Sequence, residues 1–160
     1  MSLQRLWPSA ADETFIIKQS LMIADCYKHW TGRHLIPPGL SDEETAQAIF
    51  KAPFVVASTN HEAEPILNYG NRTALTLWEL SWEAFTQTPG KHTAEAPERE
   101  QREKFLNQVK QHGFVNDYRG VRVTSTGKRF EIYRATVWNL LDENGMFSGQ
   151  AVMFKEWTFL

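Results

Sequence analysis

Cysteine is nearly absent from this sequence of 160 residues, which contains one, Cys26. A single thiol excludes a disulfide within the chain and any zinc site built from several cysteines. Nothing in the sequence around Cys26 suggests an activated thiolate. We therefore interpret Cys26 as a small residue of the core or of an interface.

Long apolar runs are also missing, since the longest unbroken ones are only a few residues. A transmembrane helix needs about 20 consecutive, predominantly apolar residues, so we expect no membrane-spanning segment. The first residues, MSLQRLWPSAADE, lack the apolar stretch of a secretory signal peptide. These features predict a cytoplasmic protein without a membrane partner.

Neither sign of charge dominates the chain. It has 17 Lys and Arg against 19 Asp and Glu, a formal net charge of −2. A nucleic-acid-binding surface needs a basic face, so we expect no nucleic-acid partner. The length suits one domain with its own core.

Aromatic and β-branched residues are abundant, above all in the last third of the chain. They form three runs that are separated by turns containing Gly127 and Gly145, and glycine adopts the positive φ that short hairpins need. The pattern predicts an antiparallel meander with strands at about 114–125, 129–141 and 146–157. A hairpin over 53–59 and 65–69 adds two strands, each of which begins with a proline.

Helical patterns precede and interrupt these strands. An apolar stripe over 13–31 predicts a helix that Gly32 ends, and Ser41 with Glu44 forms a capping box for a short second helix. Further helices are expected at 71–80, 81–87 and 97–112. We divide the chain into a helical extension, 1–52, and a domain, 53–160. The wide stripe of helix 13–31 is expected to pack on the outer sheet face or against a second copy, giving a homodimer.

The order of strand, strand, helices and three strands is that of the PAS fold. Short words along 53–160 resemble, more closely, the MEKHLA domain, a PAS-like family that stands alone in bacteria and ends certain plant homeodomain transcription factors. The words that carry the resemblance are Tyr69-Gly70-Asn71, Ala74-Leu75, Ala94-Glu95, Asp117-Tyr118, Gly120-Val121-Arg122, Gly127-Lys128-Arg129-Phe130, Val137-Trp138-Asn139 and Gly149-Gln150-Ala151.

The resemblance implies an α+β fold with a five-stranded antiparallel sheet, helices on one face and the N-terminal helical extension. It implies a bacterial stand-alone member acting as a sensory, ligand-binding or protein-interaction module, with no known reaction and with an unknown cofactor. Flavin photoreceptors of the PAS class need a cysteine in the helices facing the sheet. Helices 71–80 and 81–87 contain none, which excludes covalent flavin photochemistry but not reversible flavin binding. His112, at the end of the long helix, is expected to face solvent, and no metal site is expected.

A small apolar or aromatic ligand is expected between the inner face of strands 129–157 and the helices over 71–112, where a curved sheet leaves concave space. The predicted walls are Trp78, Phe85, Phe105, Phe130, Trp138 and Phe154. Gln150 or Asn68 would orient the ligand, because a buried amide needs a hydrogen-bond partner. The predicted core that converges between sheet and helices comprises Phe54, Val56, Trp78, Phe105, Val109, Phe130, Trp138, Val152 and Phe154.

Two questions stay open at this stage. Arg122, Arg129, Asp117 and Tyr118 fit either cross-strand pairs on the open sheet face, which we favour, or a polar clamp on a carboxylate-bearing ligand. The alternative to a sensor is a small enzyme of the ketosteroid-isomerase type, with Asp117 and Tyr118 as an inward acid or base pair. No catalytic residue is expected under the favoured interpretation.

Overall fold

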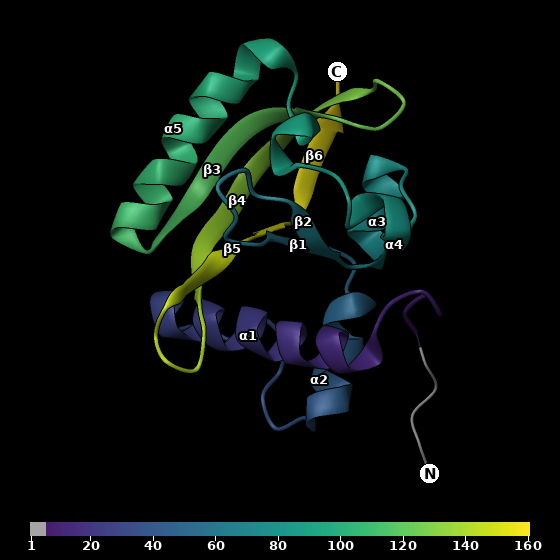
Figure 1. The fold of residues 1–160 in the computed structure, drawn as a ribbon, viewed down its shortest axis with the longest axis vertical. Coiled ribbons are helices and arrows are strands. Elements are labelled where there is room, and N and C mark those ends of the chain that lie inside the picture. Colours follow the sequence, from purple (N-terminus) through teal and green to yellow (C-terminus); the bar gives the residue numbers. More distant parts are fainter. Residues whose placement is uncertain (1–5) are drawn as a thin grey trace.

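The computed structural model describes residues 6–160 and shows one antiparallel sheet with helices on both faces (Figure 1). The strand order is β2-β1-β5-β4-β3, and a short β6 also pairs with β4. The strands are β1 Val55–Thr59, β2 Leu67–Gly70, β3 Phe114–Val123, β4 Arg129–Leu141, β5 Phe147–Phe154 and β6 Glu156–Phe159. The predicted fold class is therefore confirmed, with one strand more than expected.

Two helices of the N-terminal part cover one face of the sheet. Helix α1 spans Glu13–Thr31, is capped by Asp12, and ends where Gly32 takes φ 74°. Helix α2, Asp42–Phe50, begins with the predicted capping box of Ser41 and Glu44. Both lie together beneath the sheet in Figure 1, with α1 running across the strands.

The remaining helices lie on the opposite face. They are α3 Arg72–Trp78, α4 Trp82–Phe85, the short 3-10 turn η1 Gly90–Thr93, and α5 Ala96–His112. Asn71 and Ser81 cap α3 and α4 through hydrogen bonds to the backbone N–H of Ala74 and Ala84. Helix α5 runs alongside β3 (Figure 1) and ends at Gly113.

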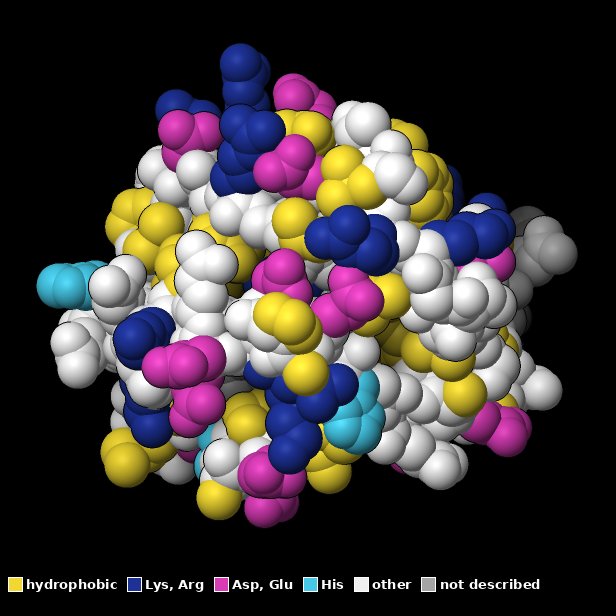
Figure 2. Space-filling model, turned by 90° about the horizontal axis from the view of Figure 1, so that it is seen from above, with side chains coloured by type: hydrophobic (Ala, Val, Ile, Leu, Met, Phe, Trp, Pro, Cys, Tyr) yellow, Lys and Arg dark blue, Asp and Glu magenta, His cyan; other side chains and the backbone are white. Residues whose placement is uncertain are grey.

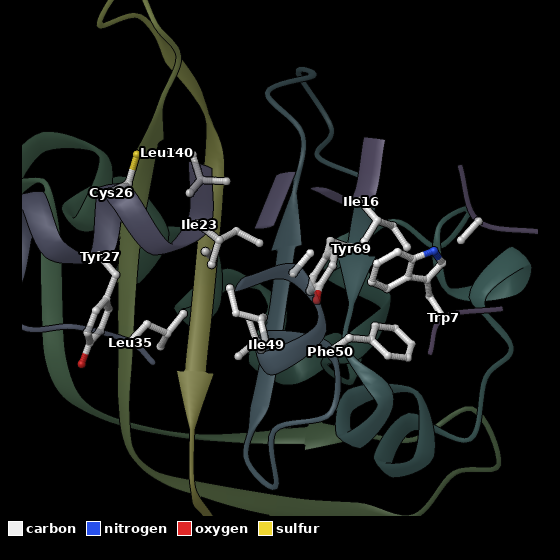
Figure 3. Packing of buried hydrophobic residues seen from close by; sticks show 14 of the residues in the cluster. Trp7, Ile16, Ile23, Cys26, Tyr27, Leu35, Ile49, Phe50, Tyr69 and Leu140 are labelled. Carbon is white, nitrogen blue, oxygen red and sulfur yellow. The ribbon is translucent and has the colours of Figure 1, made fainter. Parts of the chain in front are cut away.

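The sheet therefore has two hydrophobic clusters, one on each side. The cluster between α1 and the sheet joins helix residues such as Ile16, Ile23 and Ile49 to Tyr69 and Leu140 of the strands (Figure 3). Trp7 also belongs to it and packs edge-on against Phe50, with ring centroids 6.3 Å apart. The cluster on the opposite side comprises Val55, Ala57, Leu67, Ala74, Leu77, Trp78, Phe85, Phe130, Ile132, Ala135 and Phe154.

This division corrects the predicted single core. Val56 and Trp138 are fully buried on the α1 side, and Phe54 packs against that same cluster. Trp78, Phe130 and Phe154 do converge on the other side. The predicted set thus mixed residues from both faces of the sheet.

For Trp138, the error arises from a line of irregular residues that crosses the sheet. Asp117 of β3 and Arg134 of β4 have positive φ, 62° and 52°, and the pairing of β3 with β4 shifts on either side of Tyr118. Each strand thereby gains one residue at this line, which reverses the side to which the following residues point. Before the line, Phe130 faces α3; after it, Trp138 faces α1.

The last predicted strand, 146–157, is interrupted at the same line. Lys155 separates β5 from β6, yet both continue a single register along β4, with Met153 opposite Thr136 and Glu156 opposite Tyr133. Trp157 lies on the same side as Phe154, with ring centroids 5.7 Å apart, although simple alternation would place residues three positions apart on opposite sides. In all three C-terminal strands, the alternation of side chains between the two sides of the sheet is therefore shifted by one residue at this line.

Candidate ligand-binding cavity

A cavity of about 80 Å³ lies between the sheet and the helices α3, α4 and α5. Its walls are mostly apolar and come from the five strands β1–β5 and from all three helices. Large apolar side chains supply most of the surface: Trp78, Phe85, Phe105, Ile132, Val152 and Phe154. The cavity therefore occupies the position that the sequence predicted for a ligand.

The aromatic wall is held by edge-to-face contacts around Trp78. Its ring centroid lies 6.1 Å from that of Phe85 and 6.2 Å from that of Phe154. Phe85 lies directly over Gly70, where a Cβ atom would come within 2.6 Å of the ring. A side chain at position 70 would thus push Phe85 into the cavity.

Five of the eight predicted ligand contacts line the cavity, namely Trp78, Phe85, Phe105, Gln150 and Phe154. Phe130 packs behind Trp78, with ring centroids 5.5 Å apart, and does not line it. The structure brings the five together but leaves their contact with a ligand a prediction.

Trp138 and Asn68 lie elsewhere. Trp138 is fully buried under α1, donates its indole N–H to the carbonyl oxygen of Ile23 at 3.2 Å and packs edge-on against Tyr27. Asn68 accepts a hydrogen bond from Ser58 at 2.6 Å, and Gln19 of α1 also binds that serine. Trp138 is therefore not a wall residue, because the bulge reverses β4. Asn68, expected as a possible orienting contact, does not line the cavity either, because it bonds to Ser58 in the network on the α1 side.

Gln150 is oriented by its neighbour Asn139. The side-chain amide of Asn139 donates to the carbonyl oxygens of Val109 and Lys110, both at 3.1 Å, near the C-terminal end of α5. Its own oxygen is left to accept from Gln150 Nε2 at 3.2 Å, and Nε2 also donates to the carbonyl of Leu106 at 3.0 Å. Both N–H groups of Gln150 are therefore used within the protein, and only Oε1 can serve a ligand.

Two arginines also reach the cavity. Arg122 is only 8% exposed and donates to the carbonyl oxygen of Val121 at 2.8 Å and to the hydroxyl of Tyr118 at 3.0 Å. Tyr118 in turn stacks on Phe105 of α5, with ring centroids 3.8 Å apart. The favoured placement of Arg122 and Tyr118 on the open sheet face is wrong, because the bulge at Asp117 turns both residues under α5.

Arg102 of α5 was not considered from the sequence. It lines the cavity, and its guanidinium lies across Gly90, where a Cβ atom would come within 2.7 Å of Nη2. Burial, and then the positive charge of Arg122, lower the pKa of Arg102 to about 10. The pattern gave little signal, since Arg102 lies in a helix whose other charged residues are mostly exposed.

The remaining residues of interest lie at the surface. Asp117 is exposed, so the inward acid that the enzyme alternative requires is not at this position. Arg129 forms an ion pair with Glu95 at 2.6 Å outside the cavity. His112 is exposed at the end of α5. Within residues 6–160, no cluster of His, Cys, Asp or Glu has a metal-binding arrangement.

A wider surface cleft of about 340 Å³ adjoins the cavity and shares Thr59, Arg102, Leu106 and Gln150 with it. Charges of both signs surround this cleft, among them Lys91, which pairs with Glu64 at 3.0 Å. The shared residues lie at the boundary between the cavity and the cleft.

Cys26 is buried on the α1 side, away from this cavity. Its sulfur accepts the N–H of Leu141 at 3.2 Å and lies 3.5 Å from the carbonyl oxygen of the same residue. Burial raises the pKa of the Cys26 thiol, which the backbone hydrogen bond only partly offsets. The predicted role of Cys26 as a small core residue is confirmed.

The MEKHLA domain family model matches residues 17–159 of this chain. The chain belongs to the MEKHLA domain family. The match takes in α1 as well as the sheet. A plant regulator, the homeobox-leucine zipper protein ATHB-14 of Arabidopsis thaliana, is 26% identical over 103 residues, or 64% of this chain. The chain covers only 12% of the length of that protein.

Solved PAS domains share the fold of this MEKHLA domain. One from Colwellia psychrerythraea superposes with a TM-score of 0.62 at 15% identity and covers 74% of this chain and 95% of its own. An RNA-binding light-oxygen-voltage receptor gives 0.59 at 13% identity, over 75% of this chain and 33% of that receptor. The PAS domain of a LuxR-family regulator from Burkholderia thailandensis, in complex with ethanol, gives 0.51 at 13% identity over 71% and 95% of the two chains. At these identities, the comparison establishes a PAS-like fold.

Among the described residues, 6–160, there is no helix that is both long and apolar enough to cross a bilayer. The face of the molecule in Figure 2 carries Lys and Arg side chains interspersed with Asp and Glu, rather than gathered into one basic area. This face thus shows no basic area of the kind that nucleic-acid binding needs. The absence of a nucleic-acid partner remains a prediction.

Proposed function

We propose that this MEKHLA domain is a sensory module that binds a small, largely apolar molecule in the cavity between the sheet and helices α3–α5. The observation that carries the proposal is the cavity itself, which combines an aromatic wall with a few convergent polar groups. The LuxR-family PAS domain, whose structure was solved with ethanol, supports it by analogy, because that domain shares the fold.

We propose binding without chemical conversion. Within the described part of the chain, the cavity wall includes no Asp, Glu, His or Cys side chain. General acid–base or nucleophilic catalysis usually draws on such groups. Family membership also indicates no catalytic reaction.

Asn139 offers a route by which occupancy can reach α1. Its side chain binds both Gln150 in the cavity wall and the C-terminal carbonyls of α5. Its backbone carbonyl accepts the indole N–H of Trp30 at 2.9 Å, near the end of α1. A ligand that displaces Gln150 or α5 therefore acts on a residue that α1 also binds.

The test is a ligand screen by thermal shift on wild type and on two neighbouring β5 variants. Val152→Phe places a ring in the cavity, whereas Met153→Phe makes the same kind of change on the α1 side. Ligands of the cavity should stabilise wild type and Met153→Phe but not Val152→Phe. A ligand that stabilises all three proteins equally would place the site elsewhere.

We further propose that the domain forms a homodimer through α1. This helix lies on the outside of the molecule (Figure 1) and leaves Phe15 36% exposed, although its main stripe is already buried on the sheet. In sedimentation velocity, Phe15→Glu should convert the dimer to monomer. The matched control Leu160→Glu changes a residue that is 63% exposed at the other end of the molecule. If both variants keep the assembly state of wild type, α1 is not the interface.

The cytoplasmic location expected from the sequence stays a prediction. Fractionation of cells that express the full chain, with detection by an antibody, would test it.

A further inference from the structure

We propose that the cavity binds a small organic anion, a carboxylate on an apolar body, whose charged end lies against Arg102 and Arg122. The inference rests on the proposed function of the cavity as the ligand site and adds the chemical class of the ligand. Three properties of the cavity support this inference: two arginine side chains that form no ion pair within residues 6–160, an excess of hydrogen-bond donors in the wall, and a small volume.

Neither arginine forms an ion pair within residues 6–160, although the charge of nearby Glu103 favours the charged form of Arg102. Arg122 donates only to a backbone carbonyl and to a phenol, both of which are neutral. Within residues 6–160, Arg102 makes neither a hydrogen bond nor an ion pair, and Arg122 makes no ion pair. Glu103, beside Arg102 in α5, is exposed and bridges neither arginine. Arg122 is buried and Arg102 is half-buried. A charge withdrawn from water without an ion-pair partner is costly, so a bound anion would gain two guanidinium partners at once.

The other polar groups of the wall are mainly donors. The hydroxyl of Tyr118 accepts from Arg122, which leaves its own hydrogen free to donate. The indole Nε1 of Trp78 is buried without a hydrogen-bond partner. Gln150 adds one acceptor, Oε1, since both its N–H groups bind the protein. A wall of this kind suits a ligand that is rich in acceptors, and carboxylate oxygens match the fork of a guanidinium.

The volume limits the ligand to a few heavy atoms. At about 80 Å³ the cavity is well below the range of roughly 300–1,000 Å³ for drug-sized sites. The adjoining cleft meets it at Arg102, Leu106 and Gln150. An anion entering from the cleft therefore meets Arg102 first and can carry its apolar part inward toward Trp78.

The experiment measures binding of matched anions and neutral molecules by isothermal titration calorimetry to the full chain. The probes are butyrate and benzoate, each paired with its uncharged amide. Wild type should bind each carboxylate at least about tenfold more tightly than its amide, since hydrogen bonds to charged groups exceed neutral ones by this order.

Arg102→Gln should abolish this preference, while binding of the amides stays within about twofold. The matched control is Lys104→Gln on the same helix, whose side chain is 75% exposed and pairs with Glu100 at 3.5 Å; it should retain the preference. Arg122→Lys, which keeps one charge but loses the fork, should weaken the carboxylates without affecting the amides. Because Arg122 is buried, Arg102→Gln decides the test if the Arg122 variant does not fold.

The outcomes separate this inference from the proposed function. Carboxylates and amides that bind equally well to wild type, or a preference that survives Arg102→Gln, would overturn the anion class and leave the cavity as a ligand site. Two results together would overturn both the inference and the proposed function. The first is that no probe, charged or neutral, binds wild type at millimolar concentration. The second is that every ligand found in the thermal-shift screen stabilises Val152→Phe as much as wild type.

Discussion

Trp138 anchors the α1 side of the sheet with both its ring and its indole N–H. The ring centroid lies 5.0 Å from that of Tyr27, and Nε1 donates to the carbonyl oxygen of Ile23 at 3.2 Å. Both partners belong to α1, so this one side chain joins β4 to the helix by packing and by a hydrogen bond. Phe154 has the corresponding position in the opposite cluster, where it contacts Trp78 and Trp157.

Truncation of either residue should be strongly destabilising. Trp138→Ala and Phe154→Ala should each lower the free energy of unfolding by about 3–5 kcal/mol, because a large buried ring is lost and a cavity remains. Phe159→Ala, at a residue that is 53% exposed, should lower it by less than about 1 kcal/mol. Urea denaturation followed by circular dichroism measures all three. A small loss at Trp138 would contradict its anchoring role.

At the scale of an element, β4 is divided by the bulge at Arg134. The residues before Arg134 pair with β6, whereas those from Thr136 onward pair with β5. Arg134 adopts φ 52°, a conformation that costs a residue with a Cβ atom about 1–2 kcal/mol. Its ion pair with Glu156, at 3.9 Å and largely exposed, contributes little.

Substitutions at Arg134 should therefore have opposite effects. Arg134→Gly relieves the unfavourable φ and should raise the free energy of unfolding by up to about 1 kcal/mol, after the entropic cost of glycine. Arg134→Val puts a β-branched side chain at positive φ and should lower it by about 1–2 kcal/mol. Chemical denaturation gives both values. If Arg134→Val raised the free energy of unfolding, the positive φ at position 134 would not be the source of the cost.

The helices and strands were predictable from the sequence because their signals are local. The Ser41 capping box, the Asn71 cap and the helix end at Gly32 all occur where the pattern placed them. The side of the sheet to which each strand residue points was not predictable beyond the bulges. Asp117 and Arg134 are not glycines, so nothing in the sequence marks their positive φ, and simple alternation then assigns Trp138 to the wrong side.

The candidate site was predictable to a similar degree. Trp78, Phe85 and Phe154 could be placed because large apolar residues in short helices and in strands converge on one face. Arg102 could not, since a charged residue in a polar helix is usually exposed. Its partial burial depends on Gly90 of the preceding turn, which leaves room for the guanidinium.

For the whole molecule, the sheet functions as a shared wall between two cores. Ile16, Ile23 and Tyr27 of α1 cover Trp138 and Leu140 on one side, while α3 and α4 cover the other. The strands of the domain are thus not independent of the helical extension, because the extension supplies the helices of one of the two hydrophobic clusters.

Removal of residues 1–32 should therefore leave a protein that aggregates or loses cooperative unfolding, since it exposes the α1 side of the sheet. Light scattering and thermal denaturation followed by circular dichroism measure this. The point variant Phe15→Glu, which leaves the buried stripe in place, should by contrast unfold cooperatively. A truncated protein that is monomeric and melts like wild type would show that the α1 cluster is dispensable for folding.

The line of irregular residues through Asp117, Arg134 and Lys155 also constrains how this domain can evolve. Loss of the extra residue in one strand alone would put that strand out of phase with its partners and turn its apolar side chains to the wrong core. The three irregularities are therefore expected to be inherited as a unit, kept together or lost together. A relative that has a one-residue deletion near position 134 should carry matching deletions near 117 and 155.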